Sequence, residues 1–167
     1  ETDETNPLLL YGRQKVEIER YLQDSKEDYL ITRLALTFGS QRNDGTLFIN
    51  WLDSIEQGKT IFCAHDQICS PIYIDDVIEA LIRLIDLDCS GIFHLSGWQA
   101  LSKIRLNEIL IEQMDEYFPT TVNVFSRSIH DFKVLEKRPL NVSMSPNKLV
   151  QATGLKIRSI ETICKEI

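Results

Sequence analysis

Short apolar runs rich in β-branched and aromatic residues alternate along this chain with longer segments whose apolar residues recur at helical spacing. The runs predict strands and the periodic segments predict helices. We expect strands at 29–34, 60–63 and 91–95, and a weaker β-prone stretch at 122–125. We expect helices at 8–24, from about 47 to a glycine at 58, from 74 or 75, and at 102–117, with two short ones starting near 145 and 159. This alternation predicts an α/β fold with parallel strand pairing.

The ends of these elements carry the usual capping residues. Ser102 and Ser145 are expected to cap helices, and Pro146 suits a first helical turn. Gly154 is expected to end a helix. Residues 37–45 are expected to form a loop, because three turn-forming residues (43–45) close that stretch.

Tyr11 and Lys15 lie four residues apart in the first predicted helix, so they share one helical face. Lowering the pKa of a free tyrosine from about 10 to near 7 requires about 4 kcal/mol. A cation about 4 Å away, at an effective dielectric of about 20, supplies an interaction of that order. A phenol beside an ammonium can therefore act as a general acid or base near neutral pH. The spacing alone is also that of an ordinary surface pair.

Composition and charge limit the class of protein. With 167 residues, 43% of them apolar, the chain suits one packed domain. The formal net charge of −7 argues against nucleic acid as a partner. The charge is uneven, since residues 128–167 hold seven Lys/Arg and four Asp/Glu. This basic segment could face a diphosphate or could be a solvated surface.

The cysteines and the hydropathy indicate the environment. Cys63, Cys69, Cys89 and Cys164 have no C-x-x-C spacing, so we expect reduced thiols in a cytoplasmic protein and no metal site. No apolar stretch resembles a signal peptide or a transmembrane span, so no membrane association is expected.

Several motifs together resemble a known family. These are Asn6-Pro7, Tyr11-Gly12-x-x-Lys15, Thr32-Arg33 with Gly39, Asp66-Gln67-x-x-Ser70-Pro71-x-Tyr73-x-x-Asp76-Val77, Gly91–Gly97, and Arg138-Pro139-x-Asn141-x-Ser143-x-Ser145-x-x-Lys148-Leu149. The first three resemble the extended short-chain dehydrogenase/reductases. The later ones are similar to the dTDP-4-dehydrorhamnose reductase branch of that family. The resemblance runs from about residue 6 to the end.

The resemblance implies a fold and a reaction. The fold would be the C-terminal part of a Rossmann-like NAD(P)-binding fold plus a smaller substrate-binding lobe. The reaction would be NAD(P)H-dependent reduction of a nucleotide-linked 4-keto sugar. In this reaction Tyr11 would donate the proton. Lys15 would lower the pKa of Tyr11 and bind the ribose hydroxyls of NADP or NAD.

The resemblance also assigns binding residues. The backbone of Leu34, Ala35 and Leu36 would lie near the nicotinamide. At this place the rhamnose-forming reductases have a sequence similar to Arg-Thr-Ser-Trp. Leu36 stands at the position of its Trp. Gln67 and Ser70 belong to the loop that leads into the substrate lobe. Arg138 would contact the pyrophosphate, because a guanidinium fork suits phosphate oxygens. Its alternative role is to order the C-terminal segment.

No glycine-rich dinucleotide motif or P-loop occurs in the sequence. We therefore expect residues 1–167 to be the C-terminal part of one extended reductase domain whose N-terminal, dinucleotide-binding part is absent. We further expect this piece to be inactive alone, and its first strand to expose an apolar edge.

Two other functions remain open. One is a non-catalytic, NADP-binding regulatory subunit like the β subunit of methionine adenosyltransferase, which would bind a catalytic partner. The other is a sugar-nucleotide epimerase or dehydratase, which would keep the Tyr/Lys pair without net NAD(P)H consumption. A homodimer is also possible.

Overall fold

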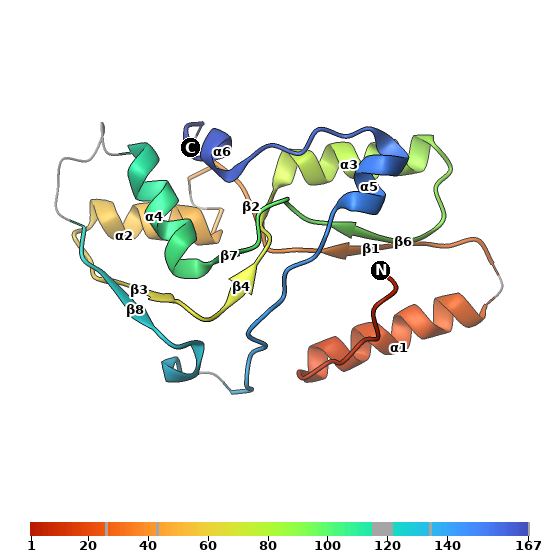
Figure 1. The fold of residues 1–167 in the computed structure, drawn as a ribbon, viewed down its shortest axis with the longest axis horizontal. Coiled ribbons are helices and arrows are strands. Elements are labelled where there is room, and N and C mark those ends of the chain that lie inside the picture. Colours follow the sequence, from red (N-terminus) through yellow and green to blue (C-terminus); the bar gives the residue numbers. More distant parts are fainter. Residues whose placement is uncertain (26, 43, 115–121, 134, 167) are drawn as a thin grey trace.

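The computed structural model describes residues 1–25, 27–42, 44–114, 122–133 and 135–166. The helices are α1 (Leu10–Asp24), α2 (Leu47–Glu56), α3 (Ile74–Asp86), α4 (Lys103–Met114), α5 (Asn147–Thr153) and α6 (Ile160–Cys164), with a 3-10 turn at Ile129–Asp131 (Figure 1). The strands are β1 (Leu30–Leu34), β2 (Thr37–Phe38), β3 (Ile61–Ala64), β4 (Ile68–Cys69), β5 (Ile72–Tyr73), β6 (Gly91–Leu95), β7 (Leu101–Ser102) and β8 (Val124–Arg127).

The strands associate in pairs, mostly parallel. β1 pairs with β6 over five residues, from Leu30 opposite Gly91 to Leu34 opposite Leu95. β2 with β5 and β3 with β8 are also parallel, so the expected parallel pairing is confirmed. The exception is the antiparallel pair of β4 and β7, two residues each. These short strands lie outside the long apolar runs, and for this reason the sequence pattern did not reveal them.

Two hydrophobic cores lie side by side, on the left and right of Figure 1. The larger core packs α2, α4 and α6 around β3. The smaller core packs α3 and α5 against β6, with β1 beside it. The chain crosses between the two cores several times, and residues 36–38 form one of these crossings. Leu36 packs against the larger core and Ala35 against the smaller one.

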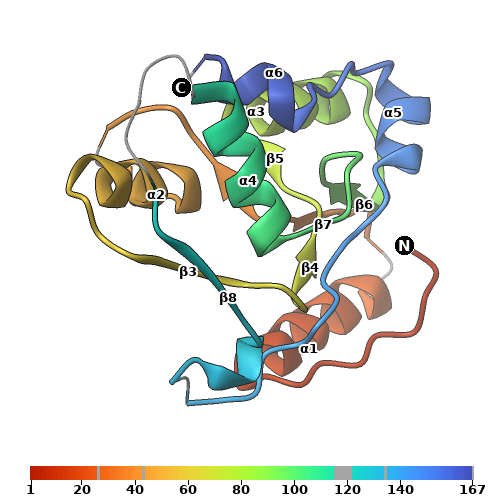
Figure 2. The ribbon, with the colours of Figure 1, turned by 60° about the vertical axis from the view of Figure 1, so that its left-hand side comes forward.

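The β1–β6 pair has a helix on each face. Successive side chains of a strand point to opposite faces. Phe93 and Leu95 enter the core beneath α3, whereas Arg33 and His94 point toward α1. Figure 1 shows α1 below this pair and α3 above it, and the turned view in Figure 2 shows the same order.

Most expected elements are present, with shifted ends. α1 begins at Leu10 rather than at residue 8, and the β-prone stretch becomes β8, which starts at Val124. α4 is described to Met114, and its expected continuation to 117 lies outside the described residues. Ser159 caps α6 by accepting a hydrogen bond from the Thr162 amide.

Residues 37–45, expected to be a loop, contain β2 instead. Phe38 is fully buried and stacks on Phe48 with ring centroids 4.4 Å apart. The Ile72 amide donates to the Leu36 carbonyl at 3.0 Å, which leads the chain into pairing with β5. Tertiary packing thus prevails over the local turn signal here.

Parts of β1, α1 and α3 lack cover in the described structure. Among the described residues β1 pairs with β6 alone, so its other edge is open as expected, but Leu34 is the one exposed residue of this strand. No residue of α1 is buried, and Leu10, Ile18 and Tyr21 are exposed. α3 also exposes Ile74, Ile78, Ile82 and Ile85. Within the described ranges, no helix combines the length and apolar character that a bilayer crossing requires.

The two faces of α3 should differ in their contribution to stability. Leu84 is fully buried, so Leu84→Ala should lower the free energy of unfolding by about 2–5 kcal/mol through the cavity that it leaves. Ile82 is 54% exposed, so the matched Ile82→Ala change should cost less than about 1 kcal/mol. Urea unfolding of both variants measures the difference. Equal losses would mean that another surface covers the exposed isoleucines.

Candidate active site

The Tyr/Lys pair lies on the surface of α1. The Lys15 ammonium is 5.3 Å from the centroid of the Tyr11 ring, so the two side chains share a face, as their spacing predicts. Tyr11 is 66% exposed and Lys15 is exposed as well. This face is therefore open to a ligand.

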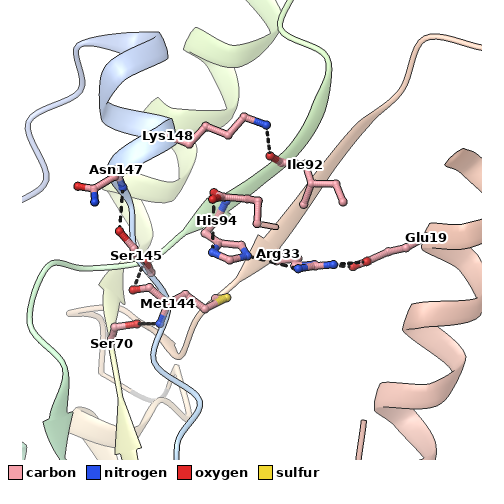
Figure 3. Close-up of polar contacts among 11 residues, drawn as sticks. Glu19, Arg33, Ser70, Ile92, His94, Met144, Ser145, Asn147 and Lys148 are labelled. Atoms are coloured by element: carbon pink, nitrogen blue, oxygen red, sulfur yellow. Dashed lines mark hydrogen bonds and ion pairs between the residues drawn. The ribbon is translucent and has the colours of Figure 1, made fainter. Parts of the chain in front are cut away.

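An ion pair fixes α1 to the sheet. The Arg33 guanidinium donates from Nε to Glu19 Oε1 at 2.9 Å and from Nη2 to Glu19 Oε2 at 2.6 Å (Figure 3). This hydrogen-bonded partner raises the pKa of Arg33. His94, on β6, lies 3.5 Å from Arg33 Nη1, and burial lowers the pKa of its imidazole. Glu19, one turn after Lys15, thus holds α1 against β1.

The predicted nicotinamide segment joins the two cores. Leu34 is 52% exposed at the carboxyl end of β1. The Ala35 amide donates to the Leu95 carbonyl at 2.9 Å, and the Leu36 carbonyl accepts from Ile72. Backbone hydrogen bonds on both sides therefore fix residues 34–36, and Leu36 is partly buried.

A cavity of about 280 Å³ lies between α2, β3, the start of α4 and the segment after β8. Three cations line it, namely Lys103, Lys133 and Arg138, together with the Gln67 amide. Its apolar wall includes Trp51 and Phe62, and Arg127 stacks on the Phe62 ring at 3.6 Å. No carboxylate occurs among its described lining residues. We call this space the basic cavity, and its charge suits an anion.

The sequence reasoning missed the exposed Lys133 of the basic cavity and, more importantly, Lys103. It is half-buried, and desolvation lowers the pKa of its ammonium, with Arg138 adding like-charge repulsion. Within the described residues no carboxylate lies within 4 Å of it. It is also the first residue of α4, where the helix dipole favours an anion. In the sequence, Lys103 was indistinguishable from any polar residue in the first turn of a helix.

The three predicted substrate residues have different surroundings. Gln67 and Arg138 meet in the basic cavity, where Gln67 Nε2 donates to the Pro139 carbonyl at 3.2 Å and so holds the Arg-Pro segment. Ser70 lies outside this cavity. Its hydroxyl is buried and accepts a hydrogen bond from the Met144 amide at 2.9 Å.

Other motif residues hold backbone segments together. Lys148 Nζ donates to the Ile92 carbonyl at 2.6 Å (Figure 3). A Cβ on Gly97 would lie 2.1 Å from the Pro71 carbonyl oxygen, so only glycine fits at 97. Asp66 accepts from Ser128 Oγ and the Ile129 amide, and the Ser128 bond leads in lowering the pKa of that carboxyl.

One contact relates the Tyr/Lys face to the basic cavity. The Leu10 amide, next to Tyr11, donates to Glu136 Oε1 at 3.2 Å. Glu136 stands two residues before Arg138. The start of α1 therefore adjoins the segment that contributes cations to the basic cavity.

Comparison with known proteins identifies the family to which this chain belongs. The model of the RmlD substrate binding domain matches residues 1–167. The chain belongs to this family. The motifs that resembled the dTDP-4-dehydrorhamnose reductase branch of the extended short-chain reductases therefore predicted the family correctly.

The relatives of this RmlD-family chain include proteins of two kinds. It is 28% identical over 179 residues to a dTDP-4-dehydrorhamnose reductase of Aggregatibacter actinomycetemcomitans, covering all of this chain and 59% of that protein. It is 29% identical over 108 residues to methionine adenosyltransferase 2 subunit beta of Xenopus tropicalis, covering 60% of this chain and 32% of that protein.

Solved structures share the fold. A dTDP-4-dehydrorhamnose reductase ortholog from Clostridium acetobutylicum superposes with a TM-score of 0.85 at 23% identity, covering 99% of this chain and 57% of that one. The Bacillus anthracis reductase, in complex with NADP, gives a TM-score of 0.82 at 22% identity with the same coverage. The Rossmann-like α/β fold class is thus confirmed. The chain spans less than three fifths of the length of these reductases.

The buried thiols should resist alkylation. All four cysteines are free, and burial raises the pKa of Cys63 to about 11 and of Cys164 to about 12. At pH 8, only about one Cys63 thiol in a thousand is ionised, and the thiolate is the reactive form. Iodoacetamide at pH 8 should therefore modify the half-buried Cys89 well before Cys63, as followed by peptide mass spectrometry. Equal rates at Cys63 and Cys89 would contradict this burial.

Proposed function

We propose that this chain supplies the proton donor and the substrate cavity of an NAD(P)H-dependent reductase acting on a nucleotide-linked 4-keto sugar. The observation that carries the proposal is the basic cavity, with its three cations and aromatic wall. Glu136, two residues before Arg138, accepts a hydrogen bond from the Leu10 amide next to Tyr11. Two phosphates need several cations, and a nucleobase packs well on an aromatic side chain. A nucleoside diphosphate sugar combines both chemistries.

Each site residue has a separate role in the proposed reaction. Tyr11 donates a proton to the carbonyl oxygen of the substrate, and Lys15 supports that proton transfer. Lys103 and Arg138, with Gln67, bind the diphosphate end. Ser70 supports the loop beside the cavity through Met144. When bound, NADP or NAD supplies the hydride.

The exposed surface at Tyr11, Lys15 and Leu34 can bind the nicotinamide end of a dinucleotide. The open Tyr11/Lys15 face and the exposed end of β1 at Leu34 can hold the nicotinamide ribose. We propose that most of the dinucleotide contacts come from a glycine-rich region outside residues 1–167. Residues 1–167 would then be the C-terminal part of one extended reductase domain.

A regulatory role is the second candidate. Leu36 removes the aromatic face that the rhamnose-forming branch presents beside the nicotinamide, and the methionine adenosyltransferase 2 subunit beta is among the relatives. Such a subunit would bind NADP and a catalytic partner without turnover. An epimerase would use Tyr11 without net consumption of NADPH. Dependence of NADPH oxidation on the sugar distinguishes the reductase from both.

Nucleotide binding by the present chain tests the basic cavity directly. Lys103→Met should weaken dTDP binding about tenfold, the loss expected for one charge-assisted contact. Isothermal titration calorimetry measures the Kd, and Lys59→Met is the control, because it removes the same charge from an exposed site that does not line the cavity. Lys103→Met should not lower the unfolding midpoint, since burial opposes the Lys103 charge. Equal Kd values in both variants would exclude Lys103 from the site.

Turnover tests the role of Tyr11. In the longest natural polypeptide that contains this sequence, NADPH or NADH absorbance is followed with a dTDP-4-keto-6-deoxy sugar. Tyr11→Phe should lower turnover by a factor of about 10²–10⁴, because the general acid is lost, with dTDP binding retained. Tyr21→Phe, an exposed tyrosine on the same helix, is the control. Unchanged turnover in Tyr11→Phe would remove Tyr11 from the mechanism.

A further inference from the structure

Three functional groups follow one another along one face of α1. Tyr11, Lys15 and Glu19 are each four residues apart, one helical turn after another. The Lys15 ammonium therefore has a phenol on one side and a carboxylate on the other. Because an ammonium and a carboxylate attract each other more strongly than an ammonium and a phenol, Glu19 is the natural competitor for Lys15.

In the structure Glu19 does not form an ion pair with Lys15. Both carboxylate oxygens are bound by the Arg33 guanidinium, at 2.9 and 2.6 Å (Figure 3). Lys15 has no carboxylate within 4 Å in the described part of the chain, and its ammonium lies 5.3 Å from the Tyr11 ring centroid. Of the two cations, Arg33 and not Lys15 therefore binds the Glu19 carboxylate.

Burial and geometry explain why Arg33 prevails. The Arg33 and Glu19 side chains are only 23% and 16% exposed, whereas Lys15 lies in solvent. A planar guanidinium binds both carboxylate oxygens at once, which a single ammonium cannot do. A Lys–Glu pair on a helix surface is weak, and weaker still when the Lys comes first.

His94 supports this arrangement from the neighbouring strand. Its Nε2 lies 3.5 Å from Arg33 Nη1, on the side of the guanidinium away from Glu19. Burial lowers the pKa of His94, which disfavours a second positive charge beside Arg33. The guanidinium is therefore held between β6 and α1.

We propose that Arg33 is a positioning residue that acts through Glu19. By binding both oxygens of Glu19, it prevents Glu19 from pairing with Lys15 and leaves the Lys15 ammonium beside Tyr11. Without Arg33, the mostly buried Glu19 carboxylate lacks its partner and draws in Lys15, the cation one turn away. The catalytic meaning of this arrangement rests on the proposed function, whereas the arrangement itself does not.

The position of Lys15 can be measured without substrate. The ε-methylene protons of Lys15 near the Tyr11 ring carry an upfield ring-current shift in proton NMR, which is assigned by its loss in Tyr11→Leu. In Arg33→Gln we expect most of this displacement to vanish as Lys15 moves to Glu19. In the double variant Arg33→Gln, Glu19→Gln we expect it to return, because the competing carboxylate is gone.

The rescue separates the proposal from a merely structural role. If Arg33 only holds α1 in place, the double variant, which also lacks the ion pair, will not recover the shift, and the proposal is wrong. An unchanged Lys15 shift in Arg33→Gln also overturns it. If Arg33→Gln does not fold, Arg33→Lys replaces it in the test. This variant keeps the positive charge, but a single ammonium does not bind both Glu19 oxygens at once. It should lose part of the shift, and an unchanged shift again overturns the proposal.

Activity is a separate readout. In the longer polypeptide, turnover should fall in Arg33→Gln and recover in the double variant, in parallel with the NMR shift. Absence of any reductase activity in the unmodified protein would overturn the proposed function alone. The Lys15 shift would still decide whether Arg33 keeps Glu19 from Lys15.

Discussion

The parallel pairing of β1 with β6 is the constraint on which the rest of the molecule depends. Its register sets Arg33 opposite His94 and Leu34 opposite Leu95. Because side chains alternate along a strand, this register sends Phe93 and Leu95 into the core under α3 and Arg33 toward α1. A slip by one residue would bury the guanidinium and expose the core, so the register and the side on which α1 docks are fixed together.

The basic cavity depends on long-range contacts rather than on any single element. Its cations come from the start of α4 and from the segment after β8, and the two meet because β3 pairs with β8. Gln67 then holds the Arg-Pro segment through the Pro139 carbonyl. Residues far apart in the chain thereby place their charges around one space, although the molecule as a whole is acidic.

The sequence predicted what is local and periodic. The helices with clear apolar stripes appeared within about two residues of their expected starts, and the Tyr11/Lys15 face follows from spacing alone. The two-residue strands were missed, since buried side chains such as Phe38 define them and local preference does not. Lys103 was missed for a similar reason, because its significance arises only when β3 and the segment around Arg138 close over it.

Motif resemblance identified the family but did not separate residues that line the basic cavity from residues that hold backbone segments together. Arg138 faces the basic cavity, whereas Ser70 and Lys148, from the same motifs, bind backbone groups at Met144 and Ile92. A side chain that fixes two loops to each other constrains a sequence as strongly as one that touches a ligand. Only the surroundings of each residue distinguish the two roles.

Two partly buried charges show how these two kinds of residue differ. Glu19 is mostly buried, and the protein itself neutralises it by two hydrogen bonds from Arg33. Lys103 is also half-buried, yet in the described structure no carboxylate lies within 4 Å of it, and the other charged residues that line the cavity are cations. Removing a charge from water is costly unless a partner compensates. The first charge therefore belongs to the scaffold that holds α1, and the second supports the anion-binding role proposed for the basic cavity.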